Sequence, residues 1–250
     1  MVSKVKPKAS RPVRRAAPSI SAFFPAYNEE ANIGPLCLKT AAALKKVTDR
    51  YEVIAVNDGS RDHTAEVVRA LHKKDPHIRL VDHAVNQGYG AAVKTGFAAA
   101  RMDWIFFTDG DGQFDVGEIA KLLPLTADYD LVVGYRIKRA DPPIRLLNAW
   151  AWGTLVRNLF RLKGVRDIDC AFKIIRRGVF DSFHLETTGA MISTELLVKA
   201  QKNGFRIAEV GVNHYPRTAG QQTGAKLGVI ARAFKELFSH FIQWQFKGYR

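Results

Sequence analysis

The chain has 250 residues, of which 47% are hydrophobic and 10% aromatic, so it can bury a substantial core in one large domain or two small ones. Its formal net charge is +14. Cys37 and Cys170 lie too far apart in sequence for a metal-type pair or a disulfide framework, which favours a reduced compartment. No run approaches the roughly 18 apolar residues that a bilayer crossing needs, and the basic N-terminus has no apolar signal core, so we expect no transmembrane segment.

The charge is unevenly distributed along the chain. Residues 1–18 hold six Lys/Arg and no acid, and residues 19–135 hold twelve bases against sixteen acids. Residues 136–177 reverse this balance with eleven bases against three acids, and residues 201–250 hold eight against two. This asymmetry indicates one end that binds a metal or nucleotide and another that faces phosphates or an anionic surface. Nucleic acid is the other partner that a basic chain suggests.

Residues 1–18 contain three prolines and no acid, and we expect a disordered tail. From Ser19 onward, strand-length apolar runs alternate with helical segments. Helices are expected from Glu29 to Val47 and after the motifs NDGSRDHT and NQGYG, which supply Asp, Asn or Gly as start signals. The expected strands are almost continuously apolar, as strands buried on both faces are, and they cover 20–24, 51–57, 78–83, 103–109 and 129–134. This alternation predicts βαβ units with right-handed crossovers and an α/β fold with a mostly parallel sheet.

After Gly134 the pattern changes. We expect a long apolar helix over 142–164, a strand over 172–177, a helix over 193–203, a strand over 205–212 and then the polar loop HYPRTAGQQTG. A terminal helix is expected over about 225–246, and its apolar positions follow helical spacing. Ile242, Trp244 and Phe246 widen the apolar face beyond a stripe, which predicts contact with an anionic membrane surface. Ordinary packing against the sheet is the alternative.

Acidic or glycine-rich motifs follow the first four expected strands: PAYNEE, NDGS, NQGYG and TDGDGQ. Because ligands of open α/β sheets bind beyond the carboxyl ends of the strands, we expect these loops to form one rim. Asp109 and Asp111 in TDGDGQ repel each other unless a cation lies beside them, so we expect them, with Gln113, to bind Mg²⁺ or Mn²⁺. Such an ion completes its shell with phosphate oxygens, which implies a phosphorylated ligand. A solvated Asp-Gly turn is the alternative.

Two other rim motifs carry carboxylates suited to a nucleotide. Asp58 in NDGS can accept hydrogen bonds from a base or ribose, and Glu29 in PAYNEE can accept them from ribose hydroxyls. In the alternative interpretation, both motifs only cap the helices that follow them. The glycines of NQGYG allow a close approach of the backbone to a ligand, although the motif lacks the Lys-Ser/Thr ending of a P-loop.

Eight motifs, in their order and spacing, resemble the family 2 glycosyltransferases of the GT-A fold, and among them the polyprenyl-phosphate sugar transferases of the dolichyl-phosphate mannose synthase type. These motifs are PAYNEE, VNDGSRDHT, NQGYGAA, TDGDGQFD, GYR, DIDCAFKIIRR, ISTELLVKAQKNGFRIAEV and YPRTAGQQTGAKLG. The resemblance covers about nine-tenths of the chain, from Ile20 to the terminal helix. It implies a Rossmann-like, mostly parallel sheet flanked by helices, with a nucleotide-sugar half (19–135), an acceptor half (136–224) and a C-terminal amphipathic helix (225–250).

The resemblance also implies roles for individual residues. The nucleotide-sugar site would comprise Pro25, Tyr27, Glu29, Asp58, Gln87, Gly88, Gly90 and Asp109. The metal would be held by Asp111, Gln113 and Asp109, and the catalytic set would be Asp111, Arg136 and Arg217. The acceptor phosphate would be held by Arg145, Arg217, Lys226 and Asp169. The loop AGQQTGAK, which contains Lys226, differs from the short small-residue loop that the family usually has there.

The implied reaction transfers a hexose, with inversion, from a nucleoside-diphosphate sugar of the GDP-mannose or UDP-glucose type to a polyprenyl phosphate. This acceptor is mostly dianionic at neutral pH and needs no base, but two anions must then be brought together by cations. Many hydroxyl-acceptor members carry Glu-Asp where this chain has Glu195 without a following aspartate. We expect a cytoplasmic enzyme bound peripherally to the inner face of the membrane, without specific nucleic-acid binding. The donor's base and sugar stay open.

Two alternatives have different consequences. A hydroxyl-acceptor glycosyltransferase acting on a glycan would use Asp169 or Glu195 as its base. A non-catalytic nucleic-acid binder would use its Lys/Arg residues and show a steep salt dependence, but it leaves the acidic rim motifs unexplained.

Overall fold

The computed structural model describes residues 17–137, 143–217, 234, 236–244 and 248–249, and for residues 143–146 it describes only the helix that contains them. The expected tail therefore lies almost entirely outside the described residues. So do residues 218–224 of the polar loop and the first part of the expected terminal helix.

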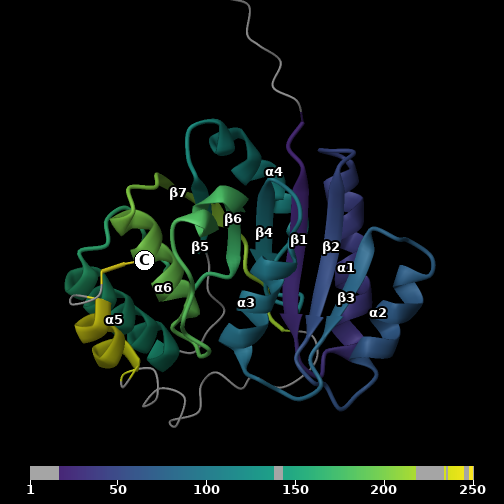
Figure 1. The fold of residues 1–250 in the computed structure, drawn as a ribbon, viewed down its shortest axis with the longest axis horizontal. Coiled ribbons are helices and arrows are strands. Elements are labelled where there is room, and N and C mark those ends of the chain that lie inside the picture. The colour runs from purple at the N-terminus through teal and green to yellow at the C-terminus, as the bar shows by residue number, and fades with distance from the viewer. Residues whose placement is uncertain (1–16, 138–142, 218–233, 235, 245–247, 250) are drawn as a thin grey trace, which may run out of the picture.

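Within the described residues, the strands form one seven-stranded sheet in the order β3-β2-β1-β4-β6-β5-β7, shown in Figure 1. Every neighbouring pair is parallel except the two that involve β6, which is antiparallel to both β4 and β5. The prediction of a mostly parallel sheet is confirmed. The strands are β1 (Ile20–Ala26), β2 (Tyr51–Asn57), β3 (Ile78–Asp82), β4 (Trp104–Thr108), β5 (Leu131–Arg136), β6 (Phe172–Arg176) and β7 (Ile207–Val212).

Helices cover both faces of the sheet (Figure 1). The helices are α1 (Glu30–Lys45), α2 (Thr64–His72), α3 (Tyr89–Ala99), α4 (Ile119–Leu122), α5 (Pro143–Phe160) and α6 (Ile192–Lys202). Helices α1 and α2 pack together on one face, and α3 lies on the other (Figure 1). Short helical turns that the sequence pattern did not predict are α4 and the 3-10 segments η1 (Val116–Glu118), η2 (Leu123–Ala127) and η3 (Arg177–Asp181).

The core explains why the first strands read as continuous apolar runs. Every residue of β1, β2 and β4 is buried, because helices cover both faces of these central strands. The rings of Phe23 and Phe107 stack with centroids 5.1 Å apart, and Phe97 of α3 meets Phe23 edge-on at 4.9 Å. A Cβ at Gly96 would lie 2.1 Å from the Phe23 ring, so α3 approaches β1 this closely because residue 96 has no side chain.

Residues 234 and 236–244 are helical, which confirms the described part of the expected terminal helix. This helix packs beside α5: the Phe160 ring lies 5.5 Å from Phe241 and 5.4 Å from Trp244. Trp244 is buried by this packing, so part of the apolar face serves the core, although these ring contacts are with α5 and not with the sheet of the alternative interpretation. Phe238 and Ile242 stay more than half exposed. No helix among the described residues has the length and apolar character needed to span a bilayer.

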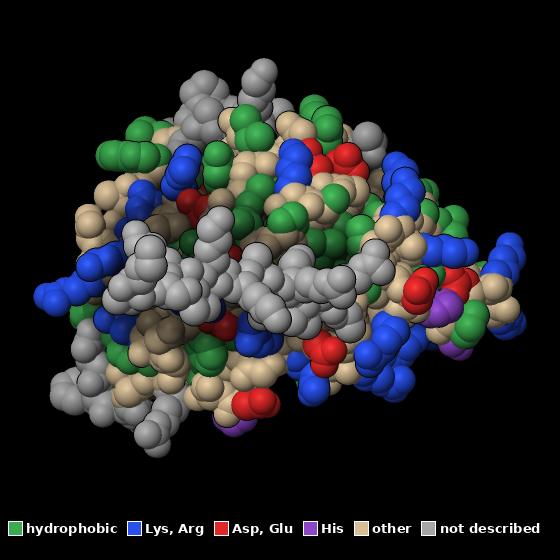
Figure 2. Space-filling view, turned by 90° about the horizontal axis from the view of Figure 1, so that it is seen from above, with side chains coloured by type: hydrophobic (Ala, Val, Ile, Leu, Met, Phe, Trp, Pro, Cys, Tyr) green, Lys and Arg blue, Asp and Glu red, His purple; other side chains and the backbone are tan. Residues whose placement is uncertain are grey.

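The positive charge is not gathered into one continuous surface on the face drawn in Figure 2. Lysine and arginine side chains are spread over this face, and acidic side chains lie among them (Figure 2). Part of the basic excess is also neutralised locally, since Arg136 and Arg217 make ion pairs with carboxylates.

Candidate active site

The loops after β1, β2 and β4 and the loop before α3 meet at one edge of the sheet, as predicted from the parallel strand order. The Asp58 amide donates to the carbonyl of Ala26 at 2.8 Å, which ties the end of β2 to the end of β1. A Cβ at Gly110 would lie 2.5 Å from the carbonyl oxygen of Pro25, so the TDGDGQ turn passes β1 at a distance that only glycine permits. The four motifs therefore form one rim.

Asp58 organises the loop Asn86–Gly90, which precedes and begins α3. Its carboxylate accepts hydrogen bonds from the backbone amides of Gln87 and Gly88, each at 2.9 Å, and contacts Nδ1 of His83 at 2.8 Å. Asp58 is only 2% exposed. In this arrangement the Asp58 carboxylate fixes the position of the loop Asn86–Gly90 at the rim. Gly88 supports this geometry, because its φ of 97° lies in the region that favours glycine.

Asp109 and Asp111 of TDGDGQ, which we call the DxD motif, follow the end of β4 two positions apart. Tyr89 at the start of α3 donates its hydroxyl to Asp109 at 2.9 Å. Burial and then the negative charge of Asp111 raise the pKa of the Asp109 carboxyl to about 7. Asp111 accepts the backbone amide of Gln113 at 3.1 Å, which shapes the turn.

Arg217 closes the rim from the far end of the chain. Its guanidinium hydrogen-bonds to Glu29 and lies 3.8 Å from a carboxylate oxygen of Asp111. Burial raises the pKa of Glu29, while hydrogen bonds from Asn32 and Arg217 oppose that rise. One arginine thus links the first rim motif to the DxD motif, although it is separated from Glu29 by most of the chain.

Gln113 helps to hold the segment that carries Arg217. Its side-chain amide donates to the carbonyl of Tyr215 at 2.8 Å, and the Tyr215 amide donates to the carbonyl of Gln113 at 2.9 Å. A bridge between Phe114 and His214 continues this pairing. The side-chain nitrogen of Gln113 is therefore occupied by Tyr215. Its side-chain oxygen is the atom that could bind a metal.

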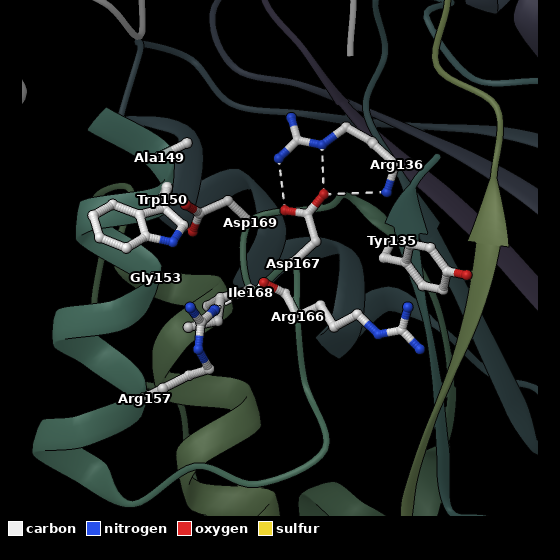
Figure 3. Close-up of a pocket in the computed structure, with 10 residues that line it drawn as sticks. All are labelled: Tyr135, Arg136, Ala149, Trp150, Gly153, Arg157, Arg166, Asp167, Ile168 and Asp169. Carbon is white, nitrogen blue, oxygen red and sulfur yellow. Dashed lines mark hydrogen bonds and ion pairs between the residues drawn. The ribbon is translucent and has the colours of Figure 1, made fainter. Parts of the chain in front are cut away.

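A second region of interest is a pocket of about 280 Å³ between the end of β5, the helix α5 and the loop before β6, shown in Figure 3. Arg136 and Asp167 face each other there with two hydrogen bonds of 2.7 Å, and the Arg136 backbone amide adds a third contact at 3.2 Å. Burial opposes the charged form of Arg136, but the hydrogen bonds and charge of Asp167 outweigh it and raise the pKa of Arg136. The pocket is lined by Tyr135, Arg136, Ala149, Trp150, Gly153, Arg157, Arg166, Asp167, Ile168 and Asp169.

Three arginines and two aspartates line this pocket, so its side chains carry a positive balance. Arg157 reaches from α5 to the backbone carbonyl of Arg166 at 2.9 Å (Figure 3). Trp150 is 65% exposed on the same helix, next to Leu147 at 57%. A charged interior therefore adjoins an apolar outer surface.

Other predicted residues are distributed as follows. Pro25 lies within β1, and Tyr27 and Gln87 are exposed on the rim. Asp169 is exposed and lines the pocket with Arg136. Arg145 falls in the first turn of α5, where its side chain lies outside the described residues, and so does all of Lys226. The rim and the pocket thus bring together the predicted residues that the structure describes.

Glu195 lies apart from both sites. It is fully buried in α6, and its carboxylate accepts the backbone amides of Glu186 and Thr187, each at 2.8 Å, and the Thr187 hydroxyl at 2.7 Å. Lys199, also fully buried, lies 3.0 Å from it. A carboxylate enclosed in this way does not reach a substrate hydroxyl, so the structure does not support Glu195 as a catalytic base.

Several residues of this region were not predicted from the sequence. Asp167 stands two positions before Asp169 in RDIDC, and its pairing with Arg136 was not anticipated. Tyr89 and His83 were also missed, although the aromatic residue inside NQGYG was a visible signal. Lys173 is fully buried in β6, where it donates to the carbonyl of Ile168 at 3.3 Å, and burial lowers its pKa.

The side chains of Asp109 and Asp111 suit the binding of a divalent cation. Both are carboxylates, which hard cations such as Mg²⁺ and Mn²⁺ prefer, and both are partly exposed at the open edge of the sheet. Among the described residues no group of three or more His, Cys, Asp or Glu forms a complete metal cage.

Comparisons with curated proteins find sugar transferases among the relatives of this chain. The chain is 33% identical over 224 residues to glycosyltransferase AglD of Haloferax volcanii, covering 85% of this chain and 36% of that protein. It is 32% identical over 209 residues to dolichyl-phosphate beta-glucosyltransferase ALG5C of Trichomonas vaginalis, covering 75% of this chain and 61% of that one. It is also 32% identical to undecaprenyl-phosphate 4-deoxy-4-formamido-L-arabinose transferase of Pseudomonas paraeruginosa, covering 86% and 63%. The chain thus spans less than two thirds of these relatives' lengths.

Solved structures share the fold. Glucosyl-3-phosphoglycerate synthase from Mycobacterium tuberculosis, crystallised with Mn²⁺, uridine diphosphate and phosphoglyceric acid, superposes with a TM-score of 0.71 at 22% identity, covering 90% of this chain and 78% of that one. A complex of the same enzyme with Mn²⁺ and uridine-diphosphate-glucose gives 0.69 at 21% identity, covering 89% and 78%. The model of glycosyl transferase family 2 matches residues 21–183, which is more than half of the chain. Together with the rim described above, this match establishes that the chain belongs to glycosyl transferase family 2.

Proposed function

We propose that this protein transfers a sugar from a nucleoside diphosphate to the phosphate of a polyprenyl lipid, with inversion at the anomeric carbon. The observation that carries the proposal is that a cationic side chain lies at the rim, whereas the glutamate considered as a base is buried away from it. Arg217 lies against the DxD motif, while the glutamate in the base position of the motif STELL is buried and bonded to main chain. An acceptor that is already ionised needs charge compensation and no proton acceptor. The printed names of the dolichyl- and undecaprenyl-phosphate relatives support this class of acceptor.

At the donor end, the loop Asn86–Gly90 and Glu29 would receive the nucleoside, and the DxD motif would face the diphosphate. Mg²⁺ or Mn²⁺, held by Asp109 and Asp111 with Gln113 beside them, would neutralise charge on the departing nucleoside diphosphate. Arg217 would add a fixed positive charge at the same place. Because the arginine is already held by Glu29 and Asp111, little reorganisation is needed when charge develops.

At the acceptor end, the pocket beside α5 would bind the lipid phosphate. Arg136 is fixed by Asp167, and Arg157 and Arg166 add to the positive balance of the lining. Two anions approach each other in the reaction, and cations between them offset a repulsion of several kcal/mol at an effective dielectric constant of about 20. Asp169 would then position the acceptor, since a phosphate nucleophile leaves no proton for it to remove.

The apolar surface outside this pocket suits a peripheral membrane enzyme. Leu147 and Trp150 of α5, with Phe238 and Ile242 of the adjacent terminal helix, are each at least half exposed. Interfacial helices bury such side chains at the boundary of a bilayer. We expect the protein to float with liposomes that contain anionic lipid, and to float less in high salt. The variant Trp150→Ser/Phe238→Ser should bind them more weakly, and absence of flotation by the unaltered protein would refute membrane contact.

The reaction is tested with purified protein, Mn²⁺, undecaprenyl phosphate and a panel of labelled sugars on UDP and GDP. The expected product is extracted into organic solvent and releases its sugar in mild acid. Arg217→Ala should lose most of this activity, and Arg177→Ala, an exposed arginine outside both sites, should keep it. A water-soluble labelled glycan formed in place of the lipid product would support the hydroxyl-acceptor alternative and overturn the proposal.

A further inference from the structure

We propose that the buried pair Glu195 and Lys199 positions the donor-binding loop through an intermediate segment, His184–Gly189, which we call the supporting segment. This inference rests on the proposed function only for the identity of the ligand, a nucleoside diphosphate. Neither side chain touches the rim. Both act as positioning residues, and the contacts that connect them to the loop Asn86–Gly90 run through main-chain atoms.

The first link joins α6 to the supporting segment. Glu195 accepts the backbone amides of Glu186 and Thr187 and the Thr187 hydroxyl, and Lys199 donates to the carbonyl of His184 at 2.7 Å. Both charged groups are fully buried and lie 3.0 Å apart. A buried ion pair is maintained only when its remaining hydrogen-bonding capacity is satisfied, and here the supporting segment satisfies it. The positions of its main-chain atoms are therefore fixed relative to α6.

The second link joins the supporting segment to the donor-binding loop. The Gly90 amide donates to the carbonyl of Thr188 at 2.9 Å. A Cβ at Gly90 would lie 2.5 Å from the Thr188 carbonyl carbon, and one at Gly88 would lie 3.2 Å from the Thr188 oxygen. The loop thus passes against this peptide without a side chain between them. On its other side, the loop is held by Asp58 through the amides of Gln87 and Gly88.

This arrangement indicates a role beyond simple stability. Replacement of a buried ion pair by apolar residues is often neutral or stabilising, so the pair is poorly explained by stability alone. Its bonds go to the main chain of a segment without regular structure, whose residues Glu186 and Thr188 are exposed. Fixed main-chain groups in such a segment define where the donor-binding loop lies. Glu195, which stands where a catalytic base was considered, therefore positions the loop Asn86–Gly90.

Thr187 provides a selective test, because Thr187→Val removes only the hydroxyl that donates to Glu195. Thr187→Ser keeps the hydroxyl and serves as the conservative rescue. Thr126→Val is the matched control, since Thr126 in η2 donates one hydroxyl hydrogen bond of 2.7 Å to Leu123 and lies outside both sites. The measurements are the Kd for UDP and for GDP with Mn²⁺ by calorimetry, and amide hydrogen exchange of the peptide spanning residues 86–90.

We expect Thr187→Val to weaken binding of the preferred nucleotide by up to about tenfold, the upper limit set by one lost hydrogen bond to a charged group, and to accelerate exchange over residues 86–90. Thr187→Ser and Thr126→Val should behave as the unaltered protein does. Glu195→Gln should leave the shape of the pH profile of kcat unchanged, whereas loss of a catalytic base would remove its acidic limb.

Unchanged nucleotide affinity and unchanged exchange in Thr187→Val would overturn the inference. Failure of the proposed function has a different signature. A protein that binds the nucleotide but makes no lipid-linked product would refute the acceptor assignment, while the binding and exchange measurements would still decide the role of the supporting segment. If the unaltered protein binds neither nucleotide, the exchange comparison alone decides it.

Discussion

The rim and the pocket, which we propose bind the donor and the acceptor, are built by different means. The rim consists of short loops at the ends of buried parallel strands, and main-chain amides, glycines and one buried aspartate set its shape. The pocket consists of long side chains from α5 and from the loop before β6, with an arginine–aspartate pair at its centre. The rim has little conformational freedom, whereas most of the pocket lining is side chain.

This difference suits the two proposed substrates. A nucleoside diphosphate has a defined shape, and a rigid backbone frame can complement it at low entropic cost. A lipid phosphate has a small charged head and a long flexible chain, so charge and an exposed apolar surface matter more than shape. The following predictions test this contrast, and the change that should matter most comes first.

Asp111→Asn should cause the largest loss. The substitution removes the charge that we propose holds the metal, and it leaves Arg217 without one of its carboxylate partners. We expect transfer from a sugar nucleotide with Mn²⁺ to fall at least about a hundredfold, since a metal ion contributes several kcal/mol to transition-state stabilisation. Asp115→Asn is the matched control, because Asp115 caps η1 in the same stretch and asparagine also caps well. Equal rates in both variants would remove Asp111 from the mechanism.

Gly90→Ala should affect the rim and spare the pocket. The new methyl group would meet the Thr188 carbonyl carbon at 2.5 Å, so the backbone must move, at a cost of about 1–3 kcal/mol. We expect a lower Tm and a weaker Kd for the nucleotide. The control is Gly178→Ala, where a Cβ would meet only the Asp181 carboxylate at 3.6 Å. Nucleotide binding equal to that of the control would show that the rim is less rigid than the contacts indicate.

Asp167→Asn should affect the pocket and spare the rim. It removes the charge that holds Arg136, while Asn keeps the size of the side chain. We expect a rise of up to about tenfold in the KM for polyprenyl phosphate, corresponding to about 1.4 kcal/mol, with the nucleotide Kd unchanged. Initial rates at varied lipid phosphate, measured beside calorimetric nucleotide binding, separate the two effects. A change in nucleotide binding of the same size would mean that the two sites are not independent.

The two cysteines give the smallest effect. Burial raises the pKa of both Cys37 and Cys170 to about 12, because an apolar environment favours the neutral thiol. At pH 8 both should therefore be protonated and inert toward a thiol reagent in the native protein, and both should react in denaturant. Cys170 follows the pocket residue Asp169, and Cys37 lies in α1, which begins just after the rim motif PAYNEE. If the pocket opens locally more often than the rim, Cys170 should react first in mild denaturant, and the reverse order would contradict the contrast.

Much of the fold was predictable from the sequence because its signals are local. Each expected strand occurs in the structure, since buried strands produce apolar runs and the first four end in turn motifs. The short turns η1, α4 and η2 were not predicted, because three to five residues give no readable period. The described part of the terminal helix packs against α5 as well as exposing Phe238 and Ile242, and helical spacing alone did not separate these two uses.

The candidate site was predictable where it follows parallel strands. Ligand positions beyond their carboxyl ends pointed to Asp58, Asp109 and Asp111. Asp167 was missed because β6 runs the other way, so residues before this strand, rather than after it, lie at the same edge as the rim. Phe172 at the start of β6 pairs with Thr108 at the end of β4. The burial of Glu195 was also beyond local patterns, because its bonding partners become adjacent only after α6 folds against the supporting segment.

The antiparallel strand β6 separates a part of the chain that the sheet fixes from a part that lines the pocket. β4 pairs with it over residues 172–176 and β5 over residues 173–175, so the sheet itself constrains this strand, while the stretch leading into it contributes Asp167 and Asp169 to the pocket. That stretch is therefore the natural place to exchange sequence between relatives. Grafting it from a relative with another lipid preference should change which acceptor is used and leave the choice of nucleotide intact.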